Sequence, residues 1–436
     1  MLVLRHDDQH QRSARRLGPR VNLGRLTAAK AVANTALRWA PPFLPVLERA
    51  FGATTAQLTT VLGLGEMAGL STVAVGRLLD RGREQLVTVL ALACISVASL
   101  IALVGTTTTF AVGFVLVVIG VSNCTVAGHS HISHRVSYAG RARAIGLYET
   151  SWAIALLVGA PIIAGLIAVV GWRGPFVALA AACAWMSVVI WRSTDTPRPT
   201  DDVDPSRALA RLDPALQHDG ARVIGDGAAS SATPTHGLEP SAIAVRPVGG
   251  VRGLDVASWA VIIGSASLAV AGLSVFAISG SWLDDAFGVS TGGLGAVAMG
   301  FGAIELLGST ASAGLADRLG KLRSTLAGIA LLIGGLAVMA TAGSTLWIGV
   351  VGILLFLCGF EFAFVTSLSL VTEANPAERG TTIAVNSGVG TVARGCSTIA
   401  SGALFTTYGI GGTLVLSGAG AVMSSIAFVV SRRVRA

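Results

Sequence analysis

The sequence predicts an all-α membrane protein whose twelve transmembrane helices form two pseudo-symmetric six-helix bundles. Three observations predict this fold class. Of the 436 residues, 53% are hydrophobic, only 12% are charged and 54 are glycine, which is typical of membrane proteins. Apolar windows recur at lengths of about 20 residues, which is the thickness of the hydrocarbon core divided by the rise of a helix. An internal repeat then divides the predicted helices into two sets of six.

The predicted spans are helices because their apolar runs are continuous and rich in Leu, Ala and Gly, whereas a barrel strand would alternate over about ten residues. The first six lie near 26–47, 56–77, 85–104, 109–130, 143–170 and 175–192. The last six lie near 256–279, 291–314, 323–342, 345–370, 379–406 and 411–431. Proline removes a backbone donor, so the first span is interrupted by Pro41, Pro42 and Pro45.

The basic residues predict the topology. The formal net charge is +8, and six arginines precede the first span. If the spans alternate, the later arginines and lysines outside the membrane lie on the same side of the membrane as these six arginines. Only Arg49 and Arg173 lie on the opposite side. The positive-inside rule then places both termini in the cytoplasm. This distribution explains the charge without a nucleic-acid partner, and we expect a monomer in the cytoplasmic membrane.

The chain is expected to divide at one polar segment, which is rich in Pro, Asp, Ser, Gly and Arg and is therefore typical of a flexible cytoplasmic linker. The predicted parts are a basic tail over 1–25, a six-helix bundle over 26–192, the linker over 193–254, a second bundle over 255–431 and a basic tail over 432–436.

An internal repeat relates the two bundles. The second span and the loop after it read LGLGEMAGLSTVAVGRLLDRGR, and the eighth span with its loop reads FGAIELLGSTASAGLADRLGK. Both have Glu-x-x-Gly, then small residues, Asp-Arg, Gly and a base, so Glu66 corresponds to Glu305, although the first copy has two more residues before the aspartate. Two matched halves joined by a linker are typical of transporters that rock one half against the other around a midplane site.

The two loops, GRLLDRGR and AGLADRLGK, resemble the signature Gly-x-Leu-Ala-Asp-Arg-x-Gly-Arg/Lys of the major facilitator superfamily. The resemblance covers the whole chain, because the helix count, the linker and the repeat also fit. The Glu-x-x-Gly is similar to that of the bacterial sugar-efflux and drug-efflux branches. The resemblance implies that the loop aspartates hold neighbouring helix ends and that the loop bases form ion pairs between the halves, made in one state and broken in another. Alternatively, these residues only mark a positive-inside loop. They are Gly76, Asp80, Arg81, Arg83, Asp317, Arg318, Gly320 and Lys321.

The fifth span contains LLVGAPIIAG, which is similar to the Gly-x-x-x-Gly-Pro-x-x-Gly-Gly pattern of exporters in the superfamily. The match rests on Gly159, Pro161 and Gly165, but ordinary close helix packing explains these residues without any antiporter role, and we expect them to be helix-packing residues. Exporters also often carry an arginine in the fourth helix, where this chain has Asn123.

Five charged residues fall near the middle of the predicted spans: Arg38, Glu66, Glu305, Glu361 and Arg394. Each would cost roughly 2.5–3.5 kcal/mol or more if left bare in lipid, so we expect them to face protein or water. Three negative charges against two positive ones leave one carboxylate without a cation, and burial favours the protonated form of such a group. We therefore expect one of these carboxylates to bind and release protons.

The resemblance also implies where these charges lie, because in the superfamily helices one, four, seven and ten line the cavity and helices two and eleven meet between the halves. Arg38 and Glu361 would then be cavity residues, Glu66 and Arg394 an ion pair between the halves, and Glu305 the carboxylate without a cation. Static salt bridges that fix helix register are the alternative interpretation.

One face of the first helix carries polar residues at four-residue spacing, which are Lys30, Asn34 and Arg38. We expect this face to look into the cavity, where Arg38 would receive an acidic or hydroxylated substrate or pair with a glutamate. The candidates for substrate contact are Asn34, Arg38, Asn123 and Glu361.

Other polar residues are given structural roles. Lys30 is expected only to snorkel toward the interface, and Glu149 to bind a basic neighbour such as Arg143. The histidines of GHSHISHRV are interpreted as interfacial residues rather than metal ligands. The five cysteines fall inside spans without paired spacing, so we expect neither disulfides nor a metal site.

The expected function is a proton-coupled secondary carrier that exports a small organic compound, such as a drug, a sugar or a metabolite. No HExxH or GxSxG motif is present, so no enzyme is expected. The loop GLADRLGKL has five residues between its glycines where a phosphate loop has four, so we expect no cofactor and take the proton gradient as the energy source. The alternatives are a symporter that imports an anionic metabolite through Arg38 and Arg394, and a non-transporting membrane sensor or enzyme.

Overall fold

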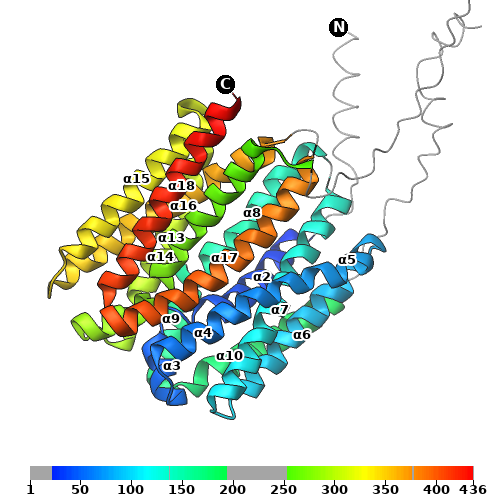
Figure 1. The fold of residues 1–436 in the computed structure, drawn as a ribbon. Coiled ribbons are helices and arrows are strands. Elements are labelled where there is room, and N and C mark those ends of the chain that lie inside the picture. Colours follow the sequence, from blue (N-terminus) through cyan, green and yellow to red (C-terminus); the bar gives the residue numbers. More distant parts are fainter. Residues whose placement is uncertain (1–21, 137, 194–252, 376–377, 436) are drawn as a thin grey trace, which may run out of the picture. The chain divides into compact units, whose positions relative to one another are not determined.

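The computed structural model describes residues 22–193 and 253–435, apart from 137 and 376–377. Within helices it describes only the backbone of residues 138, 139, 142, 313, 314, 316, 317 and 435. Most of the basic tail predicted for 1–25 and nearly all of the linker predicted for 193–254 lie outside these residues. The described part of the chain contains helices and turns but no strand, and successive spans run in opposite directions (Figure 1).

The first bundle contains all six of its predicted spans, and three of them are broken into shorter helices. Proline explains two of these breaks. The prolines that begin at Pro41 end the first helix at Arg38, and Pro161, which lacks an N–H, interrupts the fifth span at Val158. The helices are α2 (Leu23–Arg38), α3 (Leu44–Phe51), α4 (Thr55–Met67), η1 (Ala68–Ser71), α5 (Thr72–Asp80), α6 (Glu84–Ala102), α7 (Thr107–Arg135), α8 (Tyr138–Leu157), α9 (Gly159–Val170) and α10 (Arg173–Trp191).

The second bundle has one continuous helix for each predicted span, and several of these helices are longer than predicted. They are α13 (Val256–Phe287), α14 (Thr291–Leu319), α15 (Lys321–Ala340), α16 (Leu346–Glu373), α17 (Arg379–Tyr408) and α18 (Ile410–Arg435).

Ten of the twelve spans are long and apolar enough to cross a membrane by themselves. The two exceptions are the first span, which is split into α2 and α3, and α17, which is rich in Ser, Thr and Gly. α2 is covered by α7, α8 and α10, and α17 packs along α4, α13 and α18. α2 and α17 are therefore surrounded by other helices, whereas the more apolar helices have surface available to lipid.

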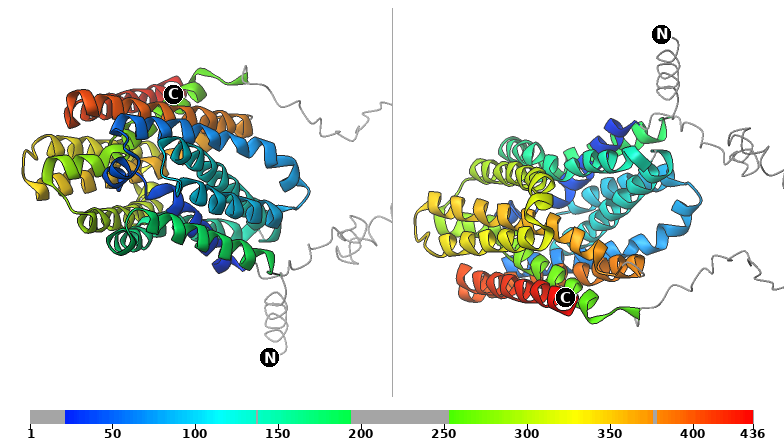
Figure 2. Two further views of the ribbon diagram at one scale, coloured as in Figure 1. Left: turned by 90° about the horizontal axis from the view of Figure 1, so that it is seen from below. Right: turned by 90° about the horizontal axis from the view of Figure 1, so that it is seen from above.

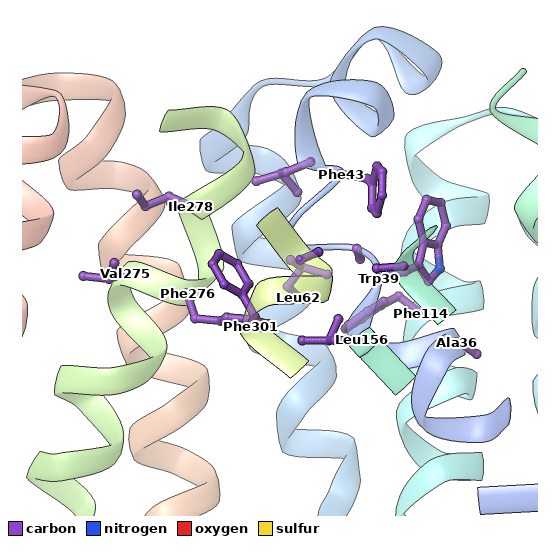
Figure 3. Close-up of a cluster of buried hydrophobic side chains, with 14 of the residues drawn as sticks. Ala36, Trp39, Phe43, Leu62, Phe114, Leu156, Val275, Phe276, Ile278 and Phe301 are labelled. Atoms are coloured by element: carbon purple, nitrogen blue, oxygen red, sulfur yellow. The ribbon is translucent and has the colours of Figure 1, made fainter. Parts of the chain in front are cut away.

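The two bundles share one hydrophobic core. In both views of Figure 2, α15 (yellow) and α6 (blue) lie on opposite sides, and the helices that join the bundles lie between them. The joining pairs are α4 with α17, α8 and α9 with α14, and α3 with α13. Leu62 and Leu156 of the first bundle belong to the same buried cluster as Phe276 and Phe301 of the second (Figure 3).

The ends of the helices define two sides of the molecule. We call the side where α2 begins and α18 ends the terminal side, and the opposite side, which carries the turns at Gly52, Gly171, Gly288 and Gly409, the far side. The midplane charges of α2, α4, α14, α16 and α17 lie between the two.

Candidate functional site

An ion pair whose two side chains are both buried joins the two bundles near their middle. Arg38 Nη1 donates to Glu305 Oε2 at 2.7 Å, and Arg38 Nη2 binds the other carboxylate oxygen, so the pair is bidentate. The side chains are only 5% and 7% exposed. Nη1 also donates to the carbonyl of Trp152 at 2.8 Å, and the guanidinium lies 4.3 Å from the Trp152 ring. The proline break just after Arg38 and the α8 backbone thus fix the cation in place.

A second ion pair joins the bundles at the repeat-related glutamate. Arg394 Nε of α17 donates to Glu66 Oε2 of α4 at 3.3 Å, and its Nη2 donates to Thr391 Oγ1 at 3.1 Å. The Glu66 and Arg394 side chains are 24% and 34% exposed. This is the pairing that the sequence predicted, in a looser and wetter form than the pair at Glu305.

The carboxylate without a cation is different from the expected one. Glu305 was expected to lack a partner, but it binds Arg38. Glu361 of α16 instead accepts a hydrogen bond from Ser309 Oγ at 2.5 Å, and among the described residues no Lys, Arg or His nitrogen lies within ion-pair distance of it. A count of charges cannot assign partners, because the rotation of each helix about its axis decides which carboxylate meets which arginine.

The Glu-x-x-Gly repeat extends by one glycine that the sequence analysis missed. Gly63 and Gly302 stand three residues before Glu66 and Glu305. A Cβ on Gly302 would lie 2.7 Å from the carbonyl oxygen of Ala153, and a Cβ on Gly395 would lie 2.6 Å from that of Gly63. These glycines therefore let the bundles touch backbone to backbone one turn from each ion pair. The shared Gly-x-x-Glu-x-x-Gly spacing is the signal that could have revealed them.

The second glycine of each repeat faces its own bundle. A Cβ on Gly69 would lie 3.1 Å from Ser122 Oγ of α7, and a Cβ on Gly308 would lie 3.1 Å from Cβ of Glu361 in α16. The repeat thus brings Glu361 to within one helical turn of Glu305 along α14.

A buried cluster on the terminal side of Arg38 corrects the expectation for Lys30 and identifies the basic neighbours of Glu149. Lys30 does not snorkel, because it is 1% exposed and its Nζ donates to Glu149 Oε1 at 2.6 Å. Glu149 was expected to bind a basic neighbour such as Arg143, and its basic neighbours are Lys30 and His129, whose Nε2 lies 2.6 Å from the same oxygen. The Lys30 ammonium also lies 4.2 Å from the centre of the Tyr148 ring. Lys30 and Glu149 therefore neutralise each other inside the first bundle.

The two asparagines predicted to contact substrate are buried against protein in this conformation. Asn34 Nδ2 donates to Ser151 Oγ at 3.3 Å. Asn123 Nδ2 donates to the carbonyl of Ile119 at 2.8 Å and to Ser71 Oγ at 3.2 Å. The Oδ1 atoms of both are buried without a hydrogen-bond partner in the described part of the chain. Their expected exposure to a cavity is not seen, because α8 covers Asn34 and η1 covers Asn123.

The bundles are joined on the far side. Arg49 Nη1 binds Asp284 Oδ2 at 2.9 Å, and Ser281 Oγ donates to Glu48 Oε1 at 2.8 Å. A Cβ on Gly280 would lie 2.6 Å from the carbonyl oxygen of Pro41. This conformation is therefore closed on the far side.

The sequence matches the family model of the Major Facilitator Superfamily over residues 26–398. The chain belongs to this superfamily. No curated protein matches it closely enough to count as a relative.

Solved structures of superfamily transporters share the fold. A bacterial homolog of the human lysosomal transporter Spinster, solved in an inward-facing and occupied conformation, aligns with a TM-score of 0.72 at 15% identity over 94% of this chain and 96% of that one. A D-xylose-proton symporter aligns with a TM-score of 0.69 at 12% identity over 94% and 96%. The xylose transporter XylE from E. coli, in a partially occluded inward-open conformation, gives 0.65 at 12% over 93% and 95%. This chain is thus a multi-pass membrane transporter rather than an enzyme.

The superfamily loops of both halves turn at a glycine. Gly82 and Gly320 both have positive φ, at 69° and 85°, a conformation that glycine adopts without strain. Lys321 binds Glu373 of its own bundle. Asp80, Arg81, Arg83 and Arg318 are exposed, and within the described part of the chain none forms an ion pair between the bundles. The implied ion pairs therefore stay a prediction, because the side chain of Asp317 lies outside the described residues.

The exporter-like segment of the fifth span is only partly a packing element. A Cβ on Gly159 would lie 2.7 Å from Thr35 Cγ2, so this glycine lets α9 approach α2. Pro161 breaks the helix at Val158. Gly165 has open space around its Cβ direction, which corrects the packing role expected for it.

Proposed function

We propose that this protein is a secondary active transporter that exports a small organic solute by alternating access, driven by the proton gradient. One observation carries the proposal: both repeat-related glutamates, Glu66 and Glu305, bind an arginine of the opposite bundle near the middle of the spans. We infer that rocking one bundle against the other separates the partners of both pairs.

The cost of separation links rocking to protonation. Removing one partner of a buried ion pair costs about 3–5 kcal/mol, because the other charge is left uncompensated. A proton on Glu305 removes its charge and so lowers the cost of leaving Arg38. Arg38 keeps the Trp152 carbonyl and ring as contacts from its own bundle. The conformational change then requires one proton to be bound and later released.

Glu361 is the group through which we propose that the proton reaches Glu305. Glu361 belongs to α16 and lies beside Gly308 of α14, which is one helical turn from Glu305. No cation of the described residues binds Glu361. Ser309 holds its carboxylate by a single hydrogen bond. Such a carboxyl accepts a proton without breaking an ion pair.

Export is proposed from the similarity of Gly159 and Pro161, and of the Glu-x-x-Gly repeat, to exporters of the superfamily. The import alternative needs Arg38 and Arg394 as receptors for an anionic metabolite. Both arginines bind glutamates in this conformation, so this use of them would require each ion pair to open first. The solved xylose symporter, at 12% identity, shares the fold alone.

The test has two stages. Accumulation of a panel of drugs, sugars and organic acids is first compared in cells with and without the protein, which identifies a transported compound. Purified protein in liposomes then moves that compound under an imposed pH gradient while a trapped dye reports proton flux. We expect compound and protons to move in opposite directions, and Glu305→Gln and Glu361→Gln to abolish the dependence on the gradient. If Glu66→Gln, Glu305→Gln and Glu361→Gln all retain pH-driven transport, proton coupling through these residues is excluded.

A further inference from the structure

A groove of about 550 Å³ runs along the first bundle between α2, α8, α9 and α10. Small residues of α2, such as Ala28 and Ala31, form its floor because they recur on one helical face. Val158 and Ile162, which are more than half exposed, form one rim. From Gly24 to Thr35 the groove follows α2 over a rise of about 17 Å, more than half of the ~30 Å hydrocarbon core.

The groove is separate from the paired charges. All of its lining residues belong to the first bundle, and the Lys30, Asn34 and Arg38 side chains leave α2 on another face. Because the exposed rim residues Val158 and Ile162 are apolar, we infer that the groove opens to the hydrocarbon of the bilayer.

One polar group in the groove has no partner. Thr27 lines the groove and is 9% exposed, and its buried Oγ1 has no hydrogen-bond partner in the described part of the chain. Two other threonines of the groove donate to carbonyls of their own helix, Thr35 to Ala31 at 2.8 Å and Thr150 to Leu147 at 2.6 Å. A buried hydroxyl without a partner costs about 1–3 kcal/mol, so an acceptor on a bound molecule is favoured beside Thr27.

Two arginines stand at the terminal-side end of the groove. Arg143 lies one turn before Leu147 on the same face of α8, and Arg25 follows Gly24 on α2. Both are exposed, and among the described residues no carboxylate lies within ion-pair distance of either guanidinium. Arginine binds phosphate well, since its planar fork matches the phosphate oxygens.

We propose that this groove is a binding site for an anionic phospholipid. The lipid phosphate binds Arg25 and Arg143, an ester oxygen accepts the hydrogen bond of Thr27, and one acyl chain lies along Ala31 toward the break between α8 and α9. The order of groups along α2, from charge to hydroxyl to apolar floor, matches the order of phosphate, ester and chain in a phospholipid.

The site is tested by native mass spectrometry of the full chain after purification from nanodiscs that contain equal amounts of dioleoyl phosphatidylglycerol and dioleoyl phosphatidylcholine. We expect phosphatidylglycerol to be retained in preference. Arg143→Gln removes one phosphate contact at an exposed position, so folding is not at risk, and we expect roughly fivefold weaker retention. Thr27→Val keeps the shape and removes the hydroxyl, and Ala31→Trp fills the groove and should release the lipid.

Matched controls lie on α15 of the second bundle, where Arg323 and Ala337 are exposed. Arg323→Gln and Ala337→Trp make the same chemical changes outside the groove and should retain lipid like the unmodified chain. Equal retention of the two lipids together with unchanged binding by Arg143→Gln would overturn the proposal in favour of a neutral apolar occupant. If Ala31→Trp retains as much phosphatidylglycerol as the unmodified chain and its thermal unfolding is normal, the lipid binds elsewhere. That result would also overturn the proposal.

Discussion

Glu66 and Glu305 occupy equivalent positions in the two bundles, and each binds an arginine of the opposite bundle. The Glu305 pair is bidentate, and its Arg38 and Glu305 side chains are 5% and 7% exposed. The Glu66 pair rests on one hydrogen bond of 3.3 Å between side chains that are 24% and 34% exposed. The same repeat therefore supports one tight and one loose contact between the bundles.

The difference comes from the partners and not from the glutamates. Arg38 ends α2 just before a proline break and is held by the carbonyl and ring of Trp152. Arg394 stands within the continuous helix α17, where Thr391 of the same helix is its other partner. The Glu66 pair is thus expected to break with the smaller free-energy change.

The largest expected effect is that of Glu305→Gln. It leaves the Arg38 charge buried without its counter-ion, so we expect a loss of about 3–5 kcal/mol in the free energy of unfolding. Denaturant unfolding in detergent measures it. The double variant Arg38→Gln/Glu305→Gln should regain most of this loss, since neither charge then remains. If the single variant is as stable as the unmodified protein, the pair is not the tight contact that the geometry indicates.

The next effect tests the glycine beside the tight pair. Gly302→Ala places a methyl group against the backbone of α8, and this overpacking costs about 1–3 kcal/mol. It should also loosen the Glu305–Arg38 ion pair, so that this pair becomes more like the Glu66–Arg394 pair. Gly292→Ala on the same helix is the control, because its Cβ would have open space. Equal thermal stabilities of the two variants would contradict the proposed close contact.

Glu66→Gln should be milder. Its pair is partly exposed, and such pairs contribute about 1 kcal/mol or less. Denaturant unfolding is expected to change little, whereas pH-driven transport in liposomes should fall because the bundles lose one of their two midplane ion pairs. A destabilisation as large as that of Glu305→Gln would remove the distinction between the two halves.

The smallest effect on stability is expected for Glu361→Gln. Glutamine still accepts the Ser309 hydrogen bond, and no ion pair of the described residues is broken. Unfolding should therefore be unchanged, while the dependence of transport on pH is lost. Unaltered pH dependence in this variant would show that the proton takes another route.

The sequence predicts the fold well because hydropathy and the repeat are both encoded over many residues. All twelve spans were predicted near their observed positions, and the Glu66–Arg394 pair was proposed from the superfamily arrangement of helices two and eleven. The one-turn neighbours Gly63 and Gly302 were readable from the repeat but were missed.

The remaining partners could not be predicted, because contacts between helices depend on rotation and on breaks that charge counting ignores. Glu305 binds Arg38 since α2 ends at its proline break with that guanidinium directed at α14. Lys30 is buried because Glu149 and Tyr148 lie on the face of α8 that packs against α2. A sequence gives the spacing of such residues on one helix but not which neighbouring helix they face.

The most direct test of the central claim measures distances between spin labels on the terminal side of the two bundles as pH is changed. Labels at Val73 of α5 and Ile383 of α17, both exposed, report across the bundles once the five native cysteines are replaced. A pair at Val73 and Val97 within the first bundle is the control. We predict that acid increases a short-distance population in the cross-bundle pair, and that Glu305→Gln shows this population at every pH. A single distance distribution that neither acid nor Glu305→Gln changes would contradict the account.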